Sequence, residues 1–203
     1  MVMPELDARR AQVMAALDPE LTRAPTRAAI DRYTGVLYRE LDAASMQPGA
    51  RRRLRRDVLI ASGLWGFVAP GDAIPDYRLK MGAKLDGIGR MASWWRPSLT
   101  DSLAARVDRA VVWDLLPLEH SAAIDWRSLA PRLRVTVRFR DPSGRTISHW
   151  NKLLKGSLVR WLCETGARDP LSLVDFDHPL GYRLDRKESQ VGDRDVALVL
   201  VQR

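Results

Sequence analysis

Apolar positions along the chain repeat with two different periods, so both helices and strands are expected. Residues 5–17 carry Leu6, Val13 and Leu17 at helical spacing, which predicts an amphipathic helix. Residues 132–140 alternate between basic or hydroxyl side chains and apolar ones, which predicts a strand with two unlike faces. The pattern therefore favours a mixed α and β protein.

Glycine, proline and further apolar runs predict the remaining elements. Helices are expected over residues 28–42 with an interruption at Gly35, from Pro48 onward, over 91–107 with a start or kink at Pro97, and over 151–164. Strands are expected within 57–68 with a turn at Gly66, and over 74–81, 110–116 and 196–201, with 145–149 pairing back on 132–140 as a hairpin. These elements predict an α+β fold, in which residues 1–203 form a single domain with a mixed or antiparallel sheet and surrounding helices.

Length, cysteine content and hydropathy narrow the class of protein. The chain has 203 residues, which suits one domain, and its one cysteine, Cys163, excludes an internal disulfide. The start of the chain has no apolar signal-peptide core, and no apolar run approaches the ~20 residues that cross a bilayer. We therefore expect a cytoplasmic protein with no membrane partner.

Positive charge is concentrated in one part of the chain. The net charge is +8, from 33 basic and 25 acidic residues. Residues 127–160 hold nine of the basic residues and one acid, so this segment alone carries 9 − 1 = +8, and the rest, 24 against 24, is neutral. A local excess of this kind indicates a surface for nucleic acid.

The basic residues of this segment fall on a strand and on the helix after it. Alternate positions of strand 132–140 place its arginines on one face, and arginine grips phosphate with a planar fork. On the helix, the basic side chains share one side with Gly156, whose missing Cβ would admit a ligand backbone. The candidate nucleic-acid-binding residues are Arg132, Arg134, Arg138, Arg140, Lys152, Lys155, Gly156 and Arg160.

The same pattern fits a simpler interpretation. One face of an antiparallel sheet is often solvated, and acidic side chains on neighbouring strands could neutralise the arginines. The sequence leaves both possibilities open.

Other candidate sites are weaker. Gly87-Ile88-Gly89 resembles the hairpin of a helix-hairpin-helix motif, which offers backbone amides to phosphate. Residues 175–178 could place two carboxylates beside an imidazole, or could form a polar loop. The three histidines lack metal-ligand spacing, so no metal and no cofactor is expected, and the catalytic residues, if any, are unknown.

Several short strings together resemble the YaaA family, also called the peroxide stress, DUF328 or UPF0246 family. They occur in the family's order over about residues 28–165: Tyr33-Thr34-Gly35, Ser62-Gly63-Leu64-Trp65-Gly66, Asp72 with Tyr77-Arg78-Leu79, and Ser148-His149-Trp150-Asn151-Lys152. The resemblance assigns to the family's motifs and cleft the residues Tyr33, Thr34, Gly35, Ser62, Gly63, Asp72, Tyr77, Arg78 and Asn151.

The resemblance implies a single α+β domain, a positively charged cleft and DNA binding. It also implies a role in limiting hydrogen peroxide damage, linked to the control of free iron, and it transfers no metal ligand or catalytic residue. The chain departs from the family pattern in lacking the usual N-terminal strand and loop, so it is expected to be shortened. Ala69 stands where the family has Arg, and Lys80 where it has Glu.

Three hypotheses follow. The first is a DNA-binding protein of the peroxide stress response that holds the phosphates of double-stranded DNA; about six contacts predict a slope of log K against log salt of about −5. The second is an enzyme acting on a nucleotide, nucleoside or damaged nucleobase, suggested by Asp72, Tyr77 and Arg78 near Trp94-Trp95. The third is a shortened relative without function. The oligomeric state stays open.

Overall fold

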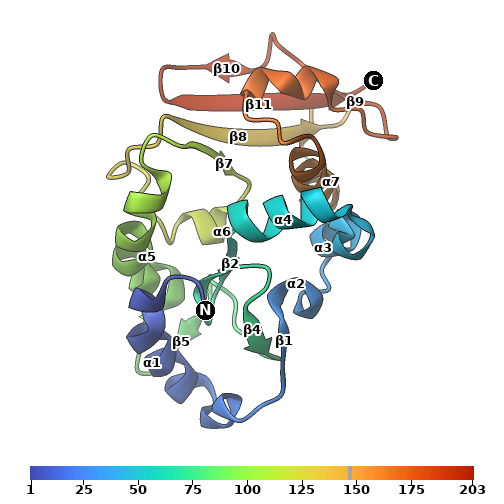
Figure 1. Cartoon of the computed structure of the whole chain (residues 1–203). Helices are drawn as coiled ribbons and strands as arrows, with labels where there is room; N and C mark the ends of the chain where they lie inside the picture. Colours follow the sequence, from blue (N-terminus) through green and yellow to red (C-terminus); the bar gives the residue numbers. More distant parts are fainter. Residues whose placement is uncertain (146–147) are drawn as a thin grey trace. The chain divides into compact units, whose positions relative to one another are not determined.

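A computed structural model describes residues 1–145 and 148–203 (Figure 1). Its contacts divide the chain into two compact units. The first unit comprises Met1–Arg32, Arg55–Asp108 and Leu116–Ala130, and the second comprises Tyr33–Leu54, Arg109–Leu115 and Pro131–Arg203. The expectation that residues 1–203 form one domain stays a prediction.

The first unit combines short helices with three separate two-stranded antiparallel pairs, β1–β4, β2–β3 and β5–β6. Its elements are η1 (Pro4–Leu6), α1 (Asp7–Leu17), η2 (Pro19–Thr22), β1 (Thr26–Ala28), α2 (Ala29–Arg32), β2 (Ile60–Ser62), β3 (Gly66–Val68), β4 (Ala73–Pro75), β5 (Lys84–Leu85), β6 (Gly89–Arg90), α5 (Met91–Val107) and α6 (Leu118–Ser121). The end of α4, from Arg55, also belongs to it.

A buried arginine organises the first unit. Arg10 of α1 is 2% exposed and lies on the same helix face as Leu6 and Val13, which are also buried. Its guanidinium donates to the Trp65 carbonyl (3.1 Å) and to the Phe67 carbonyl (2.9 Å). Further bonds reach the carbonyls of Val2 and Met3 and the carboxylate of Asp7. The charge is therefore fully hydrogen-bonded, as a buried guanidinium must be.

The second unit is built on one five-stranded sheet. Its elements are α3 (Val36–Leu41), η3 (Ala43–Ser45), α4 (Pro48–Asp57, of which Pro48–Leu54 lies here), β7 (Val111–Asp114), β8 (Leu133–Arg140), α7 (Ser148–Thr165), η4 (Pro170–Asp175), β9 (Tyr182–Leu184), β10 (Gln190–Val191) and β11 (Asp195–Gln202).

The sheet is mixed. The strand order is β10–β11–β8–β7, with β9 also paired to β11. Strands β7, β8 and β11 are parallel to one another, whereas β9 and β10 run antiparallel to β11 (Figure 1). Helices together with a mixed sheet confirm the predicted α+β class.

The two faces of the sheet differ as the alternation predicts. On one face Val135, Val137 and Phe139 of β8 pack with Leu154 and Leu158 of α7 in the core of this unit. The register places a buried β11 residue beside each of the three: Val196, Leu198 and Leu200. Arg134, Thr136, Arg138 and Arg140 occupy the intervening positions, and their side chains belong to the opposite face.

Three predicted elements need correction. The expected hairpin partner at 145–149 is wrong where it is described, because Ser148 and His149 begin α7 and both neighbours of β8 are parallel; residues 146–147 lie outside the described residues. The segment 57–68 contains two strands that form a hairpin. The strand within 74–81 ends at Pro75. The helix expected over 91–107 is confirmed as α5, which contains Pro97 rather than starting there. Within the described chain, no helix has the length and hydropathy required to cross a membrane.

Candidate functional site

Beyond Thr136, one edge of β8 has no strand neighbour among the described residues, because β7 ends there, while β11 pairs with the other edge. β7 ends at Asp114, which lies opposite Thr136, while β8 continues to Arg140. There the side chain of Asn151 takes the place of a strand: the Phe139 amide donates to Asn151 Oδ1 (3.2 Å), and Asn151 Nδ2 donates to the Phe139 carbonyl (3.0 Å). Asn151, a family-motif residue, therefore fixes the start of α7 to the edge of the sheet.

Asp114 lies between the basic strand and the basic helix. Its carboxylate accepts from Arg134 Nη2 (2.6 Å) and Nε (3.1 Å), and its side chain is 4% exposed. Lys155 Nζ donates to the carbonyl of Leu115, the next residue (2.9 Å). Burial lowers the pKa of Lys155, and the nearby Asp114 carboxylate raises it in part. Two of the predicted cations thus meet at this strand end.

Sequence reasoning missed Asp114. The signal that could have revealed it is its position, since it is a carboxylate that closes the otherwise apolar strand Val111–Asp114. A charged residue at the carboxyl end of a parallel strand lies where open sheets commonly bind ligands.

Two other predicted cations, Arg140 and Arg160, are engaged in ion pairs and hydrogen bonds within the protein. Arg140 Nη1 pairs with Glu188 Oε2. Arg160 Nη1 donates to the carbonyls of Leu41 (3.1 Å) and Asp42 (3.0 Å), which end α3, and Arg160 Nε pairs with Glu164 (2.9 Å). Cations commonly satisfy the last carbonyls of a helix in this way. These contacts compete with any phosphate for the two arginines.

Gly156 has a different role from the one expected. A Cβ built on it would lie 2.3 Å from the carbonyl oxygen of Leu37 and 3.1 Å from the Cβ of Glu40. Its open side is therefore filled by α3, which lies against α7 (Figure 1). The expectation that Gly156 admits a ligand backbone is corrected: the residue allows two helices of the same unit to pack closely.

Three of the predicted cationic side chains are available to bind a ligand. Arg132, Arg138 and Lys152 are exposed, and the described part of the chain offers none of them a hydrogen bond or an ion pair. Arg138 projects from the sheet face opposite the core. Phosphate contacts by these three side chains would displace no internal bond.

Motif residues of the first unit fix turns of the backbone. Ser62 Oγ accepts from the Trp65 amide (2.9 Å) and bonds the Tyr77 hydroxyl (2.6 Å). A Cβ on Gly63 would lie 2.4 Å from the Leu79 carbonyl oxygen.

Asp72 and Arg78 complete the motif residues of this unit. The Asp72 carboxylate accepts from the amides of Val2 (3.0 Å) and Ala69 (2.9 Å). Arg78 is exposed. With Asp72 and Tyr77 engaged in these bonds, the catalytic grouping suggested by the sequence gains no support from the geometry.

The Tyr33-Thr34-Gly35 motif leads into α3. The Tyr33 ring stacks on Tyr38 with centroids 5.2 Å apart, and the Gly35 carbonyl accepts from the Tyr38 amide (2.9 Å). Thr34 is exposed. Burial raises the pKa of the Tyr38 phenol, with Tyr33 adding to the effect. The motif therefore starts the helix against which Gly156 packs.

The glycine pair near residue 88 forms a hairpin, as predicted. Strands β5 and β6 pair antiparallel with Lys84 directly opposite Arg90, and both side chains are exposed. Gly87 (φ 73°) and Gly89 (φ 96°) have positive φ, and a Cβ on either would meet nothing within 4 Å. Helix α5 follows at once, but the segment 76–83 before the hairpin is non-helical, so the arrangement is hairpin-helix.

The charged and polar side chains of residues 175–178 contact different partners and do not form one group. Asp177 pairs with Arg183, while His178 is buried, accepts from the Leu180 amide through Nδ1 (3.1 Å) and places Nε2 3.6 Å from Glu40. The polar-loop interpretation fits these contacts. No group of three or more metal-ligating side chains occurs over residues 1–145 and 148–203.

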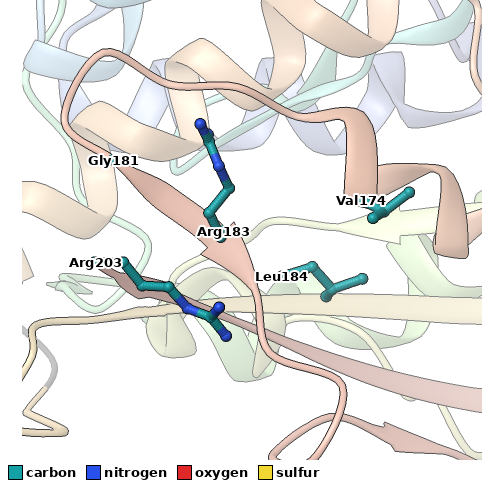
Figure 2. Close-up of a pocket in the computed structure, with 5 residues that line it drawn as sticks. All are labelled: Val174, Gly181, Arg183, Leu184 and Arg203. Atoms are coloured by element: carbon teal, nitrogen blue, oxygen red, sulfur yellow. The ribbon is translucent and has the colours of Figure 1, made fainter.

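An open pocket of about 470 Å³ lies beside β9 in the second unit. Figure 2 shows the side chains of Arg183 and Arg203 extending in different directions. The side chains of Val174 and Leu184 lie to the right of them in this view. Asp177 neutralises Arg183, and Asp185 lies 3.8 Å from Arg203. The pocket contains none of the motif residues.

The family model and the individual relatives that match this chain point to the same family. The family model described as "Peroxide stress protein YaaA" matches residues 2–188. UPF0246 proteins of Streptomyces coelicolor and Corynebacterium efficiens are each 38% identical, over 90% and 73% of this chain, and one of Methylibium petroleiphilum is 33% identical over 87%. The matched parts cover 72%, 59% and 71% of these relatives. The chain therefore belongs to the YaaA (UPF0246) family of peroxide stress proteins.

Proposed function

We propose that this protein acts in the peroxide stress response by binding the phosphate backbone of DNA with little reading of base sequence. Membership of the YaaA family supports the peroxide stress role. The net charge of +8 supports an anionic partner. A cytoplasmic location fits this role and stays a prediction.

The β5–β6 hairpin carries the proposal. Like charges directly opposite each other on paired strands are destabilising, and Lys84 and Arg90 have this relationship. For these two, the described residues provide neither a hydrogen bond nor an ion pair. A phosphate placed between them would relieve the repulsion, and the open turn at Gly87 and Gly89 leaves the backbone accessible to it.

In the second unit, Arg132, Arg138 and Lys152 are the cations that we assign to phosphate contacts. The remaining predicted residues make contacts within the protein. Three arginines pair with carboxylates, namely Arg134, Arg140 and Arg160. Lys155 donates to a backbone carbonyl, and Gly156 allows a neighbouring helix to pack closely. This division distinguishes residues that bind DNA from residues that hold the fold.

Salt-titrated binding to duplex DNA tests the proposal. Each phosphate contact contributes about −0.9 to the slope of log K against log salt. The variant Lys84→Gln/Arg90→Gln is expected to make the slope less negative by about 1.8, and Arg138→Gln/Lys152→Gln by a similar amount. Unrelated DNA sequences should lose affinity equally, because phosphate contacts carry no sequence information.

A control with the same change in charge is Arg23→Gln/Arg56→Gln. Arg23 lies 3.8 Å from Glu20, and Arg56 pairs with Asp57 (2.6 Å), so both arginines are already neutralised. This variant should keep most of the wild-type slope. A flat salt dependence of the wild type, or an equal loss in the control, would overturn the proposal.

A further inference from the structure

The outer edge of β9 is open to the addition of another strand. β9 (Tyr182–Leu184) pairs with β11 along one side, and the Asp185 amide that follows it donates to the Val199 carbonyl of β11 (2.8 Å). Because bonded and non-bonded positions alternate along antiparallel strands, the amides and carbonyls of Tyr182 and Leu184 point away from β11. Within the described part of the chain, no other backbone group bonds them. Such an edge is a template for strand addition.

Apolar side chains lie exposed beside this edge. Leu171 and Val174 of η4 are 45% and 53% exposed, and their spacing of three places them on one side of a 3₁₀ helix. Between them, Leu173 is part of the core, so η4 lies on the core face of the sheet. Leu184 belongs to the same face, because it lies opposite the buried Leu200. Val174 and Leu184 line the open pocket of about 470 Å³, which can accept an apolar side chain from an added strand (Figure 2).

Two arginines, Arg183 and Arg203, also line this pocket. Arg183 precedes Leu184, so its side chain belongs to the opposite face of the sheet, and Figure 2 shows it extending away from Leu184. Arg183 pairs with Asp177, which is 77% exposed. Arg203 lies 3.8 Å from Asp185. Ion pairs between exposed side chains contribute little to stability, so a carboxylate of a partner can replace these aspartates.

We propose that β9 binds an extended segment of a partner protein, in which an acidic residue is flanked on both sides by apolar residues. The segment adds antiparallel to β9, with its backbone bonded to Tyr182 and Leu184. Its acidic residue then lies opposite Arg183 at a non-hydrogen-bonded position, where facing side chains are closest. Its apolar residues lie opposite Tyr182 and Leu184 and point to the sheet face on which Val174 lines the pocket.

A second copy of this chain is a poorer occupant of the edge. It carries the same net charge of +8, which opposes association. Where two β9 strands overlap fully, Arg183 would face Arg183 of the second copy, and like charges directly opposite destabilise a strand pair. DNA is also a poorer occupant, because it has no peptide backbone that alternates donors and acceptors along the strand. The edge therefore fits an acidic peptide best.

Fluorescence anisotropy with two labelled peptides tests the proposal on the full chain. The acidic probe is Thr-Val-Glu-Val-Thr, and the matched control is Thr-Val-Lys-Val-Thr. We expect the acidic probe to bind at least about tenfold tighter, because a like charge opposite Arg183 is unfavourable. The variant Arg183→Glu should reverse this preference. Arg194→Glu makes the same change in charge at the other end of β11 and should keep the preference of wild type.

Hydrogen exchange followed by NMR gives a second readout. The acidic probe should slow exchange of the Tyr182 and Leu184 amides, which point away from β11. The Asp185 amide, already bonded to β11, should change little. Val174→Ser removes an apolar contact without a change in charge, so it should weaken binding of both peptides alike. Thermal melting checks the fold of each variant.

Equal binding of the two peptides by wild type, or an unchanged preference in Arg183→Glu, would overturn the proposal. Unchanged exchange at Tyr182 and Leu184 would also overturn it, because the peptide would then not add as a strand. Displacement of the acidic probe by duplex DNA would assign the edge to DNA instead. Dimerisation in light scattering that Arg183→Glu abolishes would assign it to a second copy, and either result overturns the choice of partner.

Discussion

Gly156 of α7 lies so close to Leu37 of α3 that a Cβ on the glycine would stand 2.3 Å from the leucine carbonyl oxygen. The obstacle is backbone, which cannot rotate away as a flexible side chain can. Beside the contact, Ser157 Oγ donates to Glu40 (2.7 Å), which ties the same two helices together. A motif glycine on a charged helix thus serves helix packing.

Substitution Gly156→Ala should therefore destabilise the protein. Alanine improves helix propensity by about 1 kcal/mol, but forced separation of packed elements costs about 1–3 kcal/mol, so we expect a net loss of up to about 2 kcal/mol. Gly49→Ala is the control, because Gly49 also lies in a helix and its Cβ would meet only Arg52 Nη2 at 3.9 Å. Urea unfolding should show a loss at Gly156 and none at Gly49; equal effects would contradict the packing role.

Substitution of the buried Arg10 should lower the stability of the first unit by more than this. Replacement Arg10→Met removes the donors for the carbonyls of Val2, Met3, Trp65 and Phe67. Loss of one partner from a buried charged network costs about 3–5 kcal/mol, so the free energy of unfolding should fall by at least about 3 kcal/mol. Arg23→Met, at a side chain that is 82% exposed, should be nearly neutral. A small loss in Arg10→Met would show that water satisfies these carbonyls.

The sequence was sufficient for the regular elements with clear periods. Strict alternation placed Val135, Val137 and Phe139 on one face of β8, and the core contains all three. The interruption of the helix at Gly35 was also predicted, since α2 ends at Arg32 and α3 begins at Val36. Local patterns determine these features, so they can be read without tertiary information.

Non-local pairing could not be predicted from the same patterns. The strand next to β8 is β11, about 60 residues later and parallel to it, so the hairpin expected from the turn at Gly144 was wrong. The partners of the arginines were equally hidden, because Asp114 and Glu188 come from distant segments. The burial of Arg10 could have been predicted from the sequence. Its spacing of four residues from Leu6 and three from Val13 places it on the apolar face of α1.

Arg134 and Arg138 share a strand face but should respond differently to mutation. Arg134→Met leaves the buried Asp114 carboxylate without its bidentate partner, so we expect a loss of about 2 kcal/mol in stability, less than for a fully buried pair because Arg134 is 24% exposed. Arg138→Met should leave stability within about 0.5 kcal/mol of wild type and weaken DNA binding. Urea unfolding and salt-titrated binding on both variants check this; similar behaviour would refute the division between structural and DNA-binding arginines.

His120 should make stability depend on pH. Burial lowers the pKa of its imidazole below the ordinary value of 6.5, against a smaller opposing effect of Glu119, and its Nδ1 is buried with no hydrogen-bond partner in the described residues. Because the unfolded chain then takes up the proton at a higher pH than the folded chain, folding loses stability as the pH falls through about 6.5. The substitution His120→Gln removes this group and leaves the other histidines in place. We therefore expect the difference in Tm between wild type and His120→Gln, measured at constant ionic strength, to shift against wild type between about pH 7.5 and 5. Carboxylates titrate in both proteins and cancel in the comparison, so a Tm difference that stays constant over this range would show that His120 keeps an ordinary pKa in the folded protein.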